Sequence, residues 1–237
     1  MSISERQDRI LKALVKSYID LAEPVSSEHL KKKCRFDFSP ATIRSEMQEL
    51  TDMGFIEQPH TSAGRVPTDK GYRFFVDSLE GDYQNKKINE RVFSFNLVVD
   101  EYLSFLHEYN RLLASLSSNL IITYLTQDRL FIKEGWSEIF EAPDFYETKR
   151  VRDFTSMVDD FENNIDDFDL ELSINTYIGR EVPITKSDDF SIIISRCSFM
   201  KDDDGLIAIL GPKRMAYDKN IFLIRSVIER LNNKNYG

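Results

Sequence analysis

SPATIRSEMQELTDMGFIEQPHTSAGRVPTDKGYRFFVD, residues 39–77 of a 237-residue chain, contains in order the local signals for a helix, a strand and a polar loop. Ser39 is a preferred N-cap residue, and Pro40 occupies the first helical position, where its missing N–H costs nothing. Gly54 follows the helix at a position that favours a left-handed backbone. A short strand and a loop between Pro59 and Pro67 come next. This order predicts the second half of a winged helix, which places one helix in the major groove of DNA.

The helix within this stretch has two different faces. Apolar residues recur at helical spacing and must face a core: Ile43, Met47, Leu50 and Met53. The cap, the opposite face and its flanks carry short or hydrogen-bonding side chains: Ser39, Ala41, Thr42, Arg44, Ser45 and Gln48. Such side chains near a helix N-terminus suit base edges and phosphates, so we expect this face to bind DNA. Glu46 and Glu49 oppose this unless they are turned away or paired, and a solvated helix face is the alternative.

Two helices are expected before this one. Ser4 and Gln7 have the spacing of a capping box, and apolar residues recur at helical spacing after them. Ser26 or Ser27 can cap a short second helix. The cations at 31–35 suit the C-terminal end of that helix and can also meet phosphate. The predicted order is therefore helix, short helix, turn, recognition helix and wing.

The polar loop of the wing carries four candidate DNA contacts, namely His60, Thr61, Ser62 and Arg65. Arg65 lies in a loop flanked by prolines, which suits a contact to a phosphate or to the minor groove. The alternative is that this loop only packs on its own domain. After the wing, Thr68 can cap a last helix whose apolar residues face inward.

These motifs together resemble the HrcA family of heat-inducible transcription repressors. The resemblance rests on EPVSSEHL at 23–30, SPATIRSEM at 39–47 and QPHTSAGRVPTDKGYRFFVD at 58–77, with weaker echoes in IGRE at 178–181 and GPKRMAY at 211–217. It implies a dimeric repressor of chaperone operons that binds an inverted-repeat operator called CIRCE, with a GroEL-type chaperonin promoting the active form. It also implies a winged helix, a GAF-like domain, and a dimerising domain inserted into the latter.

The chain departs from the family pattern in three places. Ser26 stands where the family usually has Gly, and Ser45 stands where it usually has Asn. Asn pairs bidentately with adenine and Ser does not, so we expect the operator to differ at one base pair. The usual chain is also considerably longer. Because TQDRLFIKEGW at 126–136 follows a helical segment almost at once, we interpret the chain as a shortened member.

The charge of the chain is unevenly distributed. The net charge is −9 at pH 7. Residues 1–80 carry 12 Lys and Arg against 13 Asp and Glu, a net of −1, and residues 81–237 carry 19 against 27, a net of −8. The first part is nearly neutral, with cations clustered at 31–35 and 60–73. We expect modest affinity for DNA from one such module and tight binding from two.

Composition and motifs disfavour several other classes of protein. Hydrophobic residues make up 41% of the chain without a run of 18, so we expect no membrane span. The N-terminus has the pattern of a charged helix rather than a signal peptide, so we expect a cytoplasmic protein. Cys34 and Cys197 lack metal-site or disulfide spacing, which indicates reduced thiols. His29, His60 and His107 lie in three predicted elements without a catalytic motif, so we expect no enzyme, cofactor or metal site.

We divide the chain into a winged helix at 1–80, a linker at 81–87, a helical segment at 88–125 and a C-terminal domain at 126–237. In the helical segment apolar residues alternate spacings of four and three from Ile88 to Leu120, as in a coiled coil. We expect a dimer interface at this seam, through Val99, Tyr102, Leu106, Tyr109 and Leu113. A second apolar set widens the stripe, so packing in a bundle or onto the C-terminal domain is the alternative.

The C-terminal domain has the pattern of a reduced GAF-like α/β domain, which makes the whole chain α+β. Strands are expected at 129–133, 170–178, 190–198 and 206–210, and helices at 147–163 and 216–232. The acidic run at 202–205 indicates a solvated hairpin tip, with a metal site as the alternative. GAF-like folds often hold small ligands, so the alternative function is a winged-helix regulator whose C-terminal domain senses a small molecule.

Overall fold

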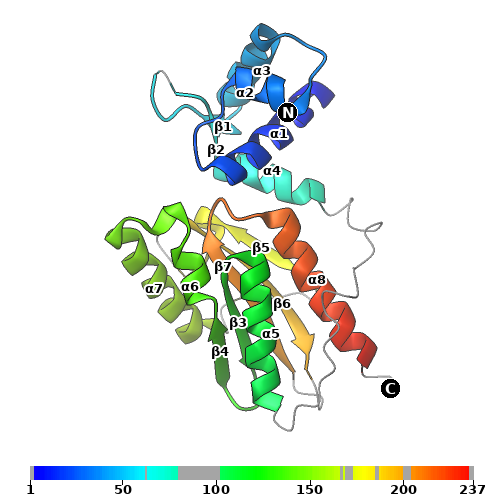
Figure 1. The fold of residues 1–237 in the computed structure, drawn as a ribbon, viewed down its shortest axis with the longest axis vertical. Helices are drawn as coiled ribbons and strands as arrows, with labels where there is room; N and C mark the ends of the chain where they lie inside the picture. The colour runs from blue at the N-terminus through cyan, green and yellow to red at the C-terminus, as the bar shows by residue number, and fades with distance from the viewer. Residues whose placement is uncertain are drawn as a thin grey trace. The chain divides into compact units, whose positions relative to one another are not determined.

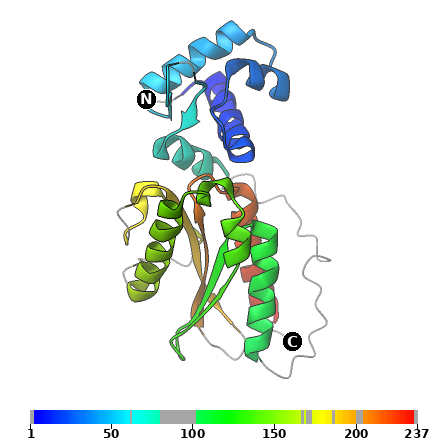
Figure 2. The same cartoon turned by 60° about the vertical axis from the view of Figure 1, so that its left-hand side comes forward.

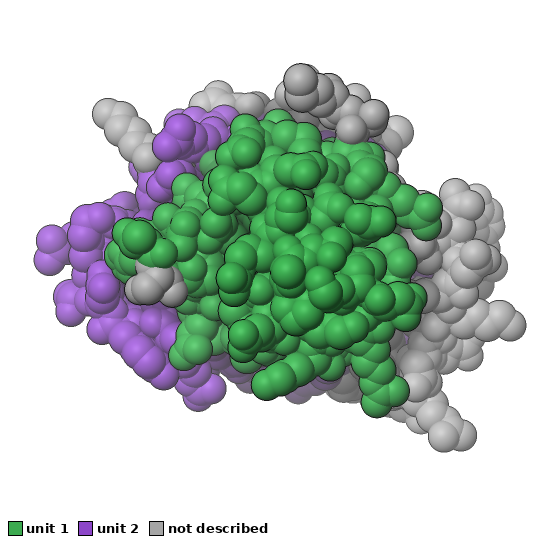
Figure 3. Space-filling view, turned by 90° about the horizontal axis from the view of Figure 1, so that it is seen from above, with its two compact units in different colours: residues 1–84 green, residues 85–237 purple. Residues whose placement is uncertain are grey.

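The computed structural model of the chain describes residues 3–61, 63–79, 102–165, 168, 173–184, 187–199 and 204–234. The chain divides into two compact units, Met1–Gln84 and Asn85–Gly237. Figure 1 shows the fold, and Figure 3 colours the first unit green and the second purple. The predicted linker at 81–87 lies outside the described residues.

The first unit contains four helices and a two-stranded sheet among its described residues. Its elements are α1 (Glu5–Leu21), α2 (Ser27–Cys34), α3 (Pro40–Asp52), β1 (Ile56–Glu57), β2 (Val66–Pro67) and α4 (Asp69–Leu79). The two strands are antiparallel, with Ile56 opposite Pro67 and Glu57 opposite Val66. The structure therefore confirms the predicted order of helix, short helix, recognition helix, wing and last helix.

Local caps explain where the first two helices begin. Ser4 Oγ accepts the backbone N–H of Gln7 at 3.2 Å, and Gln7 Oε1 accepts the backbone N–H of Ser4 at 2.9 Å. This reciprocal pair is the predicted capping box. Ser26, rather than Ser27, caps α2 by accepting the backbone N–H of His29 at 3.1 Å. Each cap satisfies a backbone N–H that has no partner within its helix.

The core of the first unit is formed by one apolar face from each helix. Fully buried side chains come from α1, α2, α3 and α4, namely Ile10, Leu11, Leu14, Leu30, Ile43, Leu50, Tyr72 and Phe75. Gly71 allows α4 to begin close to β1, because a Cβ at Gly71 would lie 2.1 Å from the carbonyl oxygen of Phe55. Packing against this core stabilises short helices that would be marginal in isolation.

The second unit is built around a five-stranded antiparallel sheet. Its described elements are α5 (Tyr102–Ser117), β3 (Leu120–Leu125), β4 (Leu130–Glu134), α6 (Trp136–Phe140), a 3₁₀ turn (Pro143–Phe145), α7 (Thr148–Asn163), β5 (Asn175–Ile178), a second 3₁₀ turn (Gly179–Glu181), β6 (Phe190–Ser198), β7 (Asp204–Pro212) and α8 (Tyr217–Lys234). The strand order is β4-β3-β7-β6-β5. The strand pairs are antiparallel throughout. Together with the winged helix, this sheet and its helices confirm the α+β class.

Helices cover both faces of this sheet (Figures 1 and 2). Helices α5 and α8 pack on one face and are buried against β3, β4 and β6, while α6 and α7 lie over the other. Side chains alternate along β3 accordingly. Leu120 and Ile122 join a core cluster that includes Phe154 of α7, whereas Thr123 donates its hydroxyl hydrogen to Asn110 Oδ1 of α5 at 2.9 Å. Three layers result from this alternation.

The predicted strands of the second unit agree in part with the observed ones. The strand predicted at 190–198 is observed over the same residues, and those at 129–133 and 206–210 are observed with small shifts. The strand predicted at 170–178 is observed as Asn175–Ile178, and residues 170–172 lie outside the described part. Of the acidic run, Asp204 and Gly205 belong to β7. The GAF-like assignment stays a prediction.

The helical segment predicted at 88–125 is wrong at its C-terminal end. Within the described part, helix ends at Ser117, and Leu120–Leu125 is the central strand β3. Ser118 has a φ of 56°, a left-handed conformation that ends the helix. LIITYL is apolar or β-branched throughout and buried on both faces, and such runs lack the alternation that distinguishes strand from helix.

Three residues of the predicted dimer seam are buried inside the second unit instead of lying on its surface. Leu106, Tyr109 and Leu113 have exposed fractions of 1%, 5% and 1%, because α5 packs onto β3 and β4 of its own unit. Their heptad-like spacing reflects this packing onto the sheet, which was the alternative interpretation. Val99 lies outside the described residues, and for Tyr102 the structure describes the backbone. The buried residues of α5 therefore do not form a dimer surface.

Both cysteines are free thiols. Burial raises the pKa of the Cys197 thiol in β6, and the nearby Asp204 carboxylate raises it further. Burial also raises the pKa of Cys34, with Lys33 opposing the shift. Neither thiol is activated as a nucleophile, because activation requires a lowered pKa.

Candidate nucleic-acid interface

Helix α3 exposes the face that the sequence assigns to DNA. Ile43, Met47 and Leu50 are buried with exposed fractions of 0%, 4% and 0%, which turns the opposite side outward. Met53, the fourth residue of the predicted stripe, caps the helix and is half-buried. The outward side carries Ala41, Arg44, Ser45 and Gln48, all exposed, with the half-buried Thr42 on its flank. Asp52 extends this exposed face at its C-terminal end.

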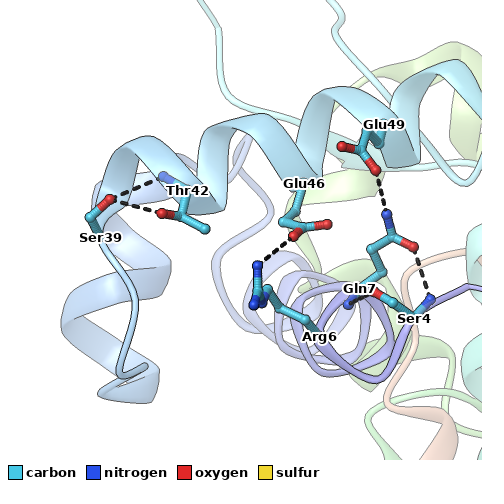
Figure 4. Close-up of polar contacts among 7 residues, drawn as sticks. All are labelled: Ser4, Arg6, Gln7, Ser39, Thr42, Glu46 and Glu49. Carbon is cyan, nitrogen blue, oxygen red and sulfur yellow. Dashed lines mark hydrogen bonds and ion pairs between the residues drawn. The ribbon is translucent and has the colours of Figure 1, made fainter.

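The N-terminus of α3 is held by its cap. Ser39 Oγ accepts the backbone N–H of Thr42 at 3.1 Å and lies 3.0 Å from Thr42 Oγ1, as Figure 4 shows. Pro40 occupies the first turn, where it lacks only an N–H that would have no partner in the helix. The first turn therefore presents a positive dipole end and two hydroxyl groups at the surface.

Two glutamates on α3 are paired with side chains of α1 (Figure 4). Glu46 Oε1 lies 3.0 Å from Arg6 Nη1, and its side chain is 14% exposed. Glu49 Oε2 accepts a hydrogen bond from Gln7 Nε2 at 2.8 Å. Residues 40 or more positions apart in sequence are brought together by the packing of α1 on α3. The Arg6 guanidinium offsets the charge of Glu46, whereas the neutral amide of Gln7 orients Glu49 without offsetting its charge.

The wing loop is organised by Gln58, which the sequence analysis did not single out. Gln58 Nε2 donates to the carbonyl oxygens of Thr61 at 2.9 Å and Ala63 at 3.0 Å. The loop therefore curls around one amide group. His60 and Thr61 are exposed, and Ser62 lies outside the described residues. A polar residue that directly follows a strand and precedes a Pro-containing loop is the signal that could have identified Gln58.

The base of the wing is hydrogen-bonded to the segment before α2. Arg65 N donates to the carbonyl oxygen of Val25 at 2.8 Å, and Val25 N donates to the carbonyl oxygen of Arg65 at 2.9 Å. Gly64 makes this approach possible, because a Cβ there would lie 2.4 Å from the Val25 carbonyl oxygen. The wing is thus attached to the start of the helix-turn-helix by its main chain.

The side chain of Arg65 points to α3. Its Nε donates to Thr51 Oγ1 at 3.1 Å, and its Nη2 donates to Gln48 Oε1 at 3.1 Å. Gln48 Nε2 in turn donates to Asp52 Oδ1 at 2.9 Å. Arg65 and Gln48, which the sequence predicts as separate DNA contacts, therefore lie in one chain of hydrogen bonds.

A groove of about 350 Å³ lies between the start of α2, helix α3 and the wing. It is lined by Val25, Ser26, Ser27, Arg44, Met47, Gln58, Thr61, Ala63, Gly64 and Arg65. Two of these lining residues are arginines, and none of them is acidic. An arginine-lined groove beside an exposed helix face favours a ligand that carries phosphate.

The predicted cation cluster at 31–35 is partly engaged within the first unit. Lys33 Nζ lies 2.6 Å from Asp20 Oδ2, and Lys31 Nζ donates to the carbonyl oxygen of Phe36. Lys32 and Arg35 are exposed. Surface ion pairs are weak and exchange readily, so these cations still contribute to the local potential.

Two properties of the described residues bear on other classes of site. Within that part of the chain, no three His, Cys, Asp or Glu side chains are grouped so that they could hold a metal ion. None of its helices has the length and apolar character that crossing a membrane requires.

Family models match both parts of the chain. Residues 2–79 match the model described as "Winged helix-turn-helix transcription repressor, HrcA DNA-binding". Residues 51–221 match the model described as "HrcA protein C terminal domain". The second match alone spans well over half of the chain.

Individual relatives show how the similarity is distributed. The heat-inducible transcription repressor HrcA of Natranaerobius thermophilus is 62% identical over 79 residues, which cover 33% of this chain and 23% of that protein. That of Clostridium acetobutylicum is 26% identical over an alignment of 335 positions, which covers 98% of each protein. Because this chain has 237 residues, the second relative contains sequence that this chain lacks. This difference in length agrees with the interpretation of a shortened chain.

A crystal structure of a hypothetical protein has the same fold. It superposes with a TM-score of 0.85, covers 98% of both chains and is 20% identical in sequence. At this identity the likeness is evidence for the fold alone.

Proposed function

This chain belongs to the HrcA family of transcription repressors, and on that premise we propose that it represses heat-shock chaperone operons by binding an inverted-repeat operator of the CIRCE type. The relatives reported above are named transcription repressors, which are not enzymes. The proposed ligand is chromosomal DNA, so the proposed location is the cytoplasm.

One observation carries the DNA-binding proposal. The outward face of α3 carries exposed neutral and basic side chains, with Asp52 at its C-terminal end hydrogen-bonded to Gln48, while Glu46 and Glu49 contact Arg6 and Gln7 of α1. A helix that enters the major groove must approach phosphates on both sides, so unpaired carboxylates on its flank would oppose binding. The ion pair at Glu46 and the contact that turns Glu49 to α1 therefore support the assignment of α3 as the recognition helix.

We assign roles to the exposed residues by their position. Arg44 and Ser45 lie on the outward face and are proposed to contact base edges. Ser39 and Thr42 lie at the positive end of the helix dipole and are proposed to face a phosphate, as are His60 and Thr61 on the wing. Ala41 is small enough to let the helix backbone approach the groove closely.

The operator is proposed to be bound by a homodimer. An inverted repeat needs two modules related by a twofold axis, and residues 1–80 have a net charge of −1, which gives weak binding for one module. Since Leu106, Tyr109 and Leu113 are core residues, the proposed dimer forms through other surfaces. Release on heat stress and modulation by a GroEL-type chaperonin are further parts of the proposal, which rest on membership of the family.

Binding to three DNA duplexes tests the proposal. The duplexes carry the inverted repeat from the organism's own chaperone promoter, a single half-site, and a scrambled repeat of equal composition. We expect protection of both half-sites in a footprint, and affinity for the full repeat at least 10³-fold above that for scrambled DNA, a typical ratio for specific binding. Equal affinity for the repeat and the scrambled duplex would refute sequence-specific repression.

A further inference from the structure

We propose that Arg65 is a positioning residue, which locks the wing to the recognition helix so that both meet DNA as one preformed surface. The effect on DNA binding rests on the proposed function, while the contact between wing and helix does not. This role differs from the phosphate contact that the sequence predicts for Arg65. It also assigns Gln48 to the support of the wing rather than to the reading of bases.

The guanidinium of Arg65 is engaged along one edge. Nε and Nη2 lie on the same side of the planar group and donate to Thr51 and Gln48, each at 3.1 Å. Two parallel donors that reach two residues of one helix define the orientation of the side chain. Thr51 is half-buried, and its hydrogen bond with Arg65 is partly buried, whereas the bond between Arg65 and Gln48 is exposed.

Both polar atoms of the Gln48 amide are occupied. Its Oε1 accepts from Arg65, and its Nε2 donates to Asp52 at 2.9 Å. Recognition of adenine by Gln uses the same two atoms, because Oε1 accepts from N6 and Nε2 donates to N7. Each atom keeps one further hydrogen-bonding position, so the two contacts fix the orientation of the amide and direct it to Arg65 and Asp52. Base preference is better assigned to Arg44 and Ser45, whose side chains are exposed on the same face.

Arg65 connects the wing to two other parts of the first unit, the segment before α2 and helix α3. Its main chain exchanges two hydrogen bonds with Val25, in the segment before α2, and its side chain reaches Gln48 and Thr51 of α3. Gly64 brings the main chains close enough for the first of these contacts. A wing anchored on both sides loses less conformational freedom when it binds DNA, so the anchor increases affinity without a contact to DNA.

Substitutions at Thr51 distinguish the positioning of the wing by Arg65 from a direct contact between the Arg65 charge and DNA. In the full-length chain, Thr51→Val removes the acceptor of Arg65 Nε and leaves every charge in place, whereas the matched control Thr51→Ser keeps the hydroxyl. We expect Thr51→Val to weaken operator binding about tenfold with an unchanged salt slope, and Thr51→Ser to bind like the parent protein. Arg65→Lys, which keeps the charge but loses the planar edge, should lose about as much.

The double variant gives the sharpest comparison. If Arg65 acts through Thr51, then Arg65→Ala combined with Thr51→Val binds no more weakly than Arg65→Ala alone. A pure phosphate contact predicts the opposite pattern: Thr51→Val binds normally, Arg65→Lys retains affinity, and Arg65→Ala lowers the salt slope by about one unit. That pattern would overturn the inference. Thermal unfolding of each variant identifies any loss that comes from misfolding.

A measurement without DNA keeps the inference separate from the proposed function. Backbone amide exchange at Val25 and Arg65 reports whether the wing base stays closed. We expect faster exchange at both amides in Thr51→Val than in Thr51→Ser. Equal exchange in the two variants would refute positioning by Arg65, whatever the DNA results. If the parent protein bound the inverted repeat and scrambled DNA equally well, the proposed function would fail. The difference in amide exchange between Thr51→Val and Thr51→Ser would still show that Arg65 positions the wing.

Discussion

The two units of the chain differ in the kind of contact that holds them together. A family model for the winged helix matches residues 2–79, and a model for the C-terminal domain matches residues 51–221. In the winged helix, polar side chains make specific hydrogen bonds. Gln58 bonds to the main chain of the wing, and Arg65 bonds to Gln48 of α3. The second unit depends on a sheet between helices, which tolerates many apolar sequences of similar volume. The first unit therefore rests more on specific polar contacts in its wing, and the second on the packing of its sheet and helices.

The two cores also differ in composition. The first unit buries mainly aliphatic faces of four helices, with Tyr72 and Phe75 from α4. The second unit contains an aromatic cluster in which the Phe154 ring lies 5.1 Å from that of Phe145 and 5.2 Å from that of Phe190. Aromatic pairs at such distances add to the stability gained from burial.

The largest effect is expected from removing the centre of the aromatic cluster. Phe154→Ala deletes a fully buried ring and should lower the free energy of unfolding of the second unit by about 3–5 kcal/mol. Hydrogen exchange measured in both units should show faster exchange in the second unit and little change in the first, since each has its own core. If the variant increased the rate of hydrogen exchange equally in both units, the two units would unfold as one cooperative body.

The next effect tests the attachment of the wing. Gly64→Ala places a Cβ 2.4 Å from the Val25 carbonyl oxygen, so the wing base must move. We expect a loss of about 2–3 kcal/mol in operator binding, comparable with the loss of a buried hydrogen-bonded contact. Gly54→Asn is the matched control, because Gly54 has open space around it and Asn tolerates its φ of 78°. Normal binding by Gly64→Ala would mean that the wing is dispensable.

A specificity change is expected at Ser45. Ser45→Asn introduces an amide that pairs bidentately with adenine, so preference at one operator position should shift toward adenine by about 1–3 kcal/mol. Selection of binding sites from a randomised duplex library measures this shift, with Gln48→Asn as a comparison on the same face. An unchanged selected sequence for Ser45→Asn would remove residue 45 from base readout.

The smallest effect concerns the paired glutamates. Arg6→Ala frees Glu46 beside the proposed DNA surface and should weaken binding by about 1 kcal/mol at low salt, with little change in stability because the pair is partly exposed. Adding Glu46→Gln to this variant should restore affinity. If the double variant binds as weakly as Arg6→Ala, then Arg6 itself contacts DNA.

The sequence predicted those parts of the structure whose signals are local. The caps at Ser4 and Ser39, the prolines and the apolar stripe of α3 each act within one helix or turn, so they identify the winged helix directly. The boundary between α5 and β3 was missed, because an apolar run buried on both faces has no distinctive period. The dimer seam was misassigned for a related reason, since heptad-like spacing equally describes a helix packed on a sheet.

The candidate surface was predicted as a set of residues but not as a network. Exposure of Arg44, Ser45 and Gln48 follows from helical periodicity. The pairing of Arg65 with Gln48 spans 17 positions and that of Arg6 with Glu46 spans 40, and such contacts depend on how helices pack. Tertiary packing therefore decides which polar side chains are free for a ligand.

Hydrogen exchange of the full-length chain with and without the inverted-repeat duplex tests the central claim most directly. The account predicts that operator DNA slows exchange in peptides that cover 39–48 of α3 and 58–66 of the wing, and that the scrambled duplex leaves them unchanged. Protection by the operator confined to the second unit, with none in α3 or the wing, would contradict the assignment of the recognition surface.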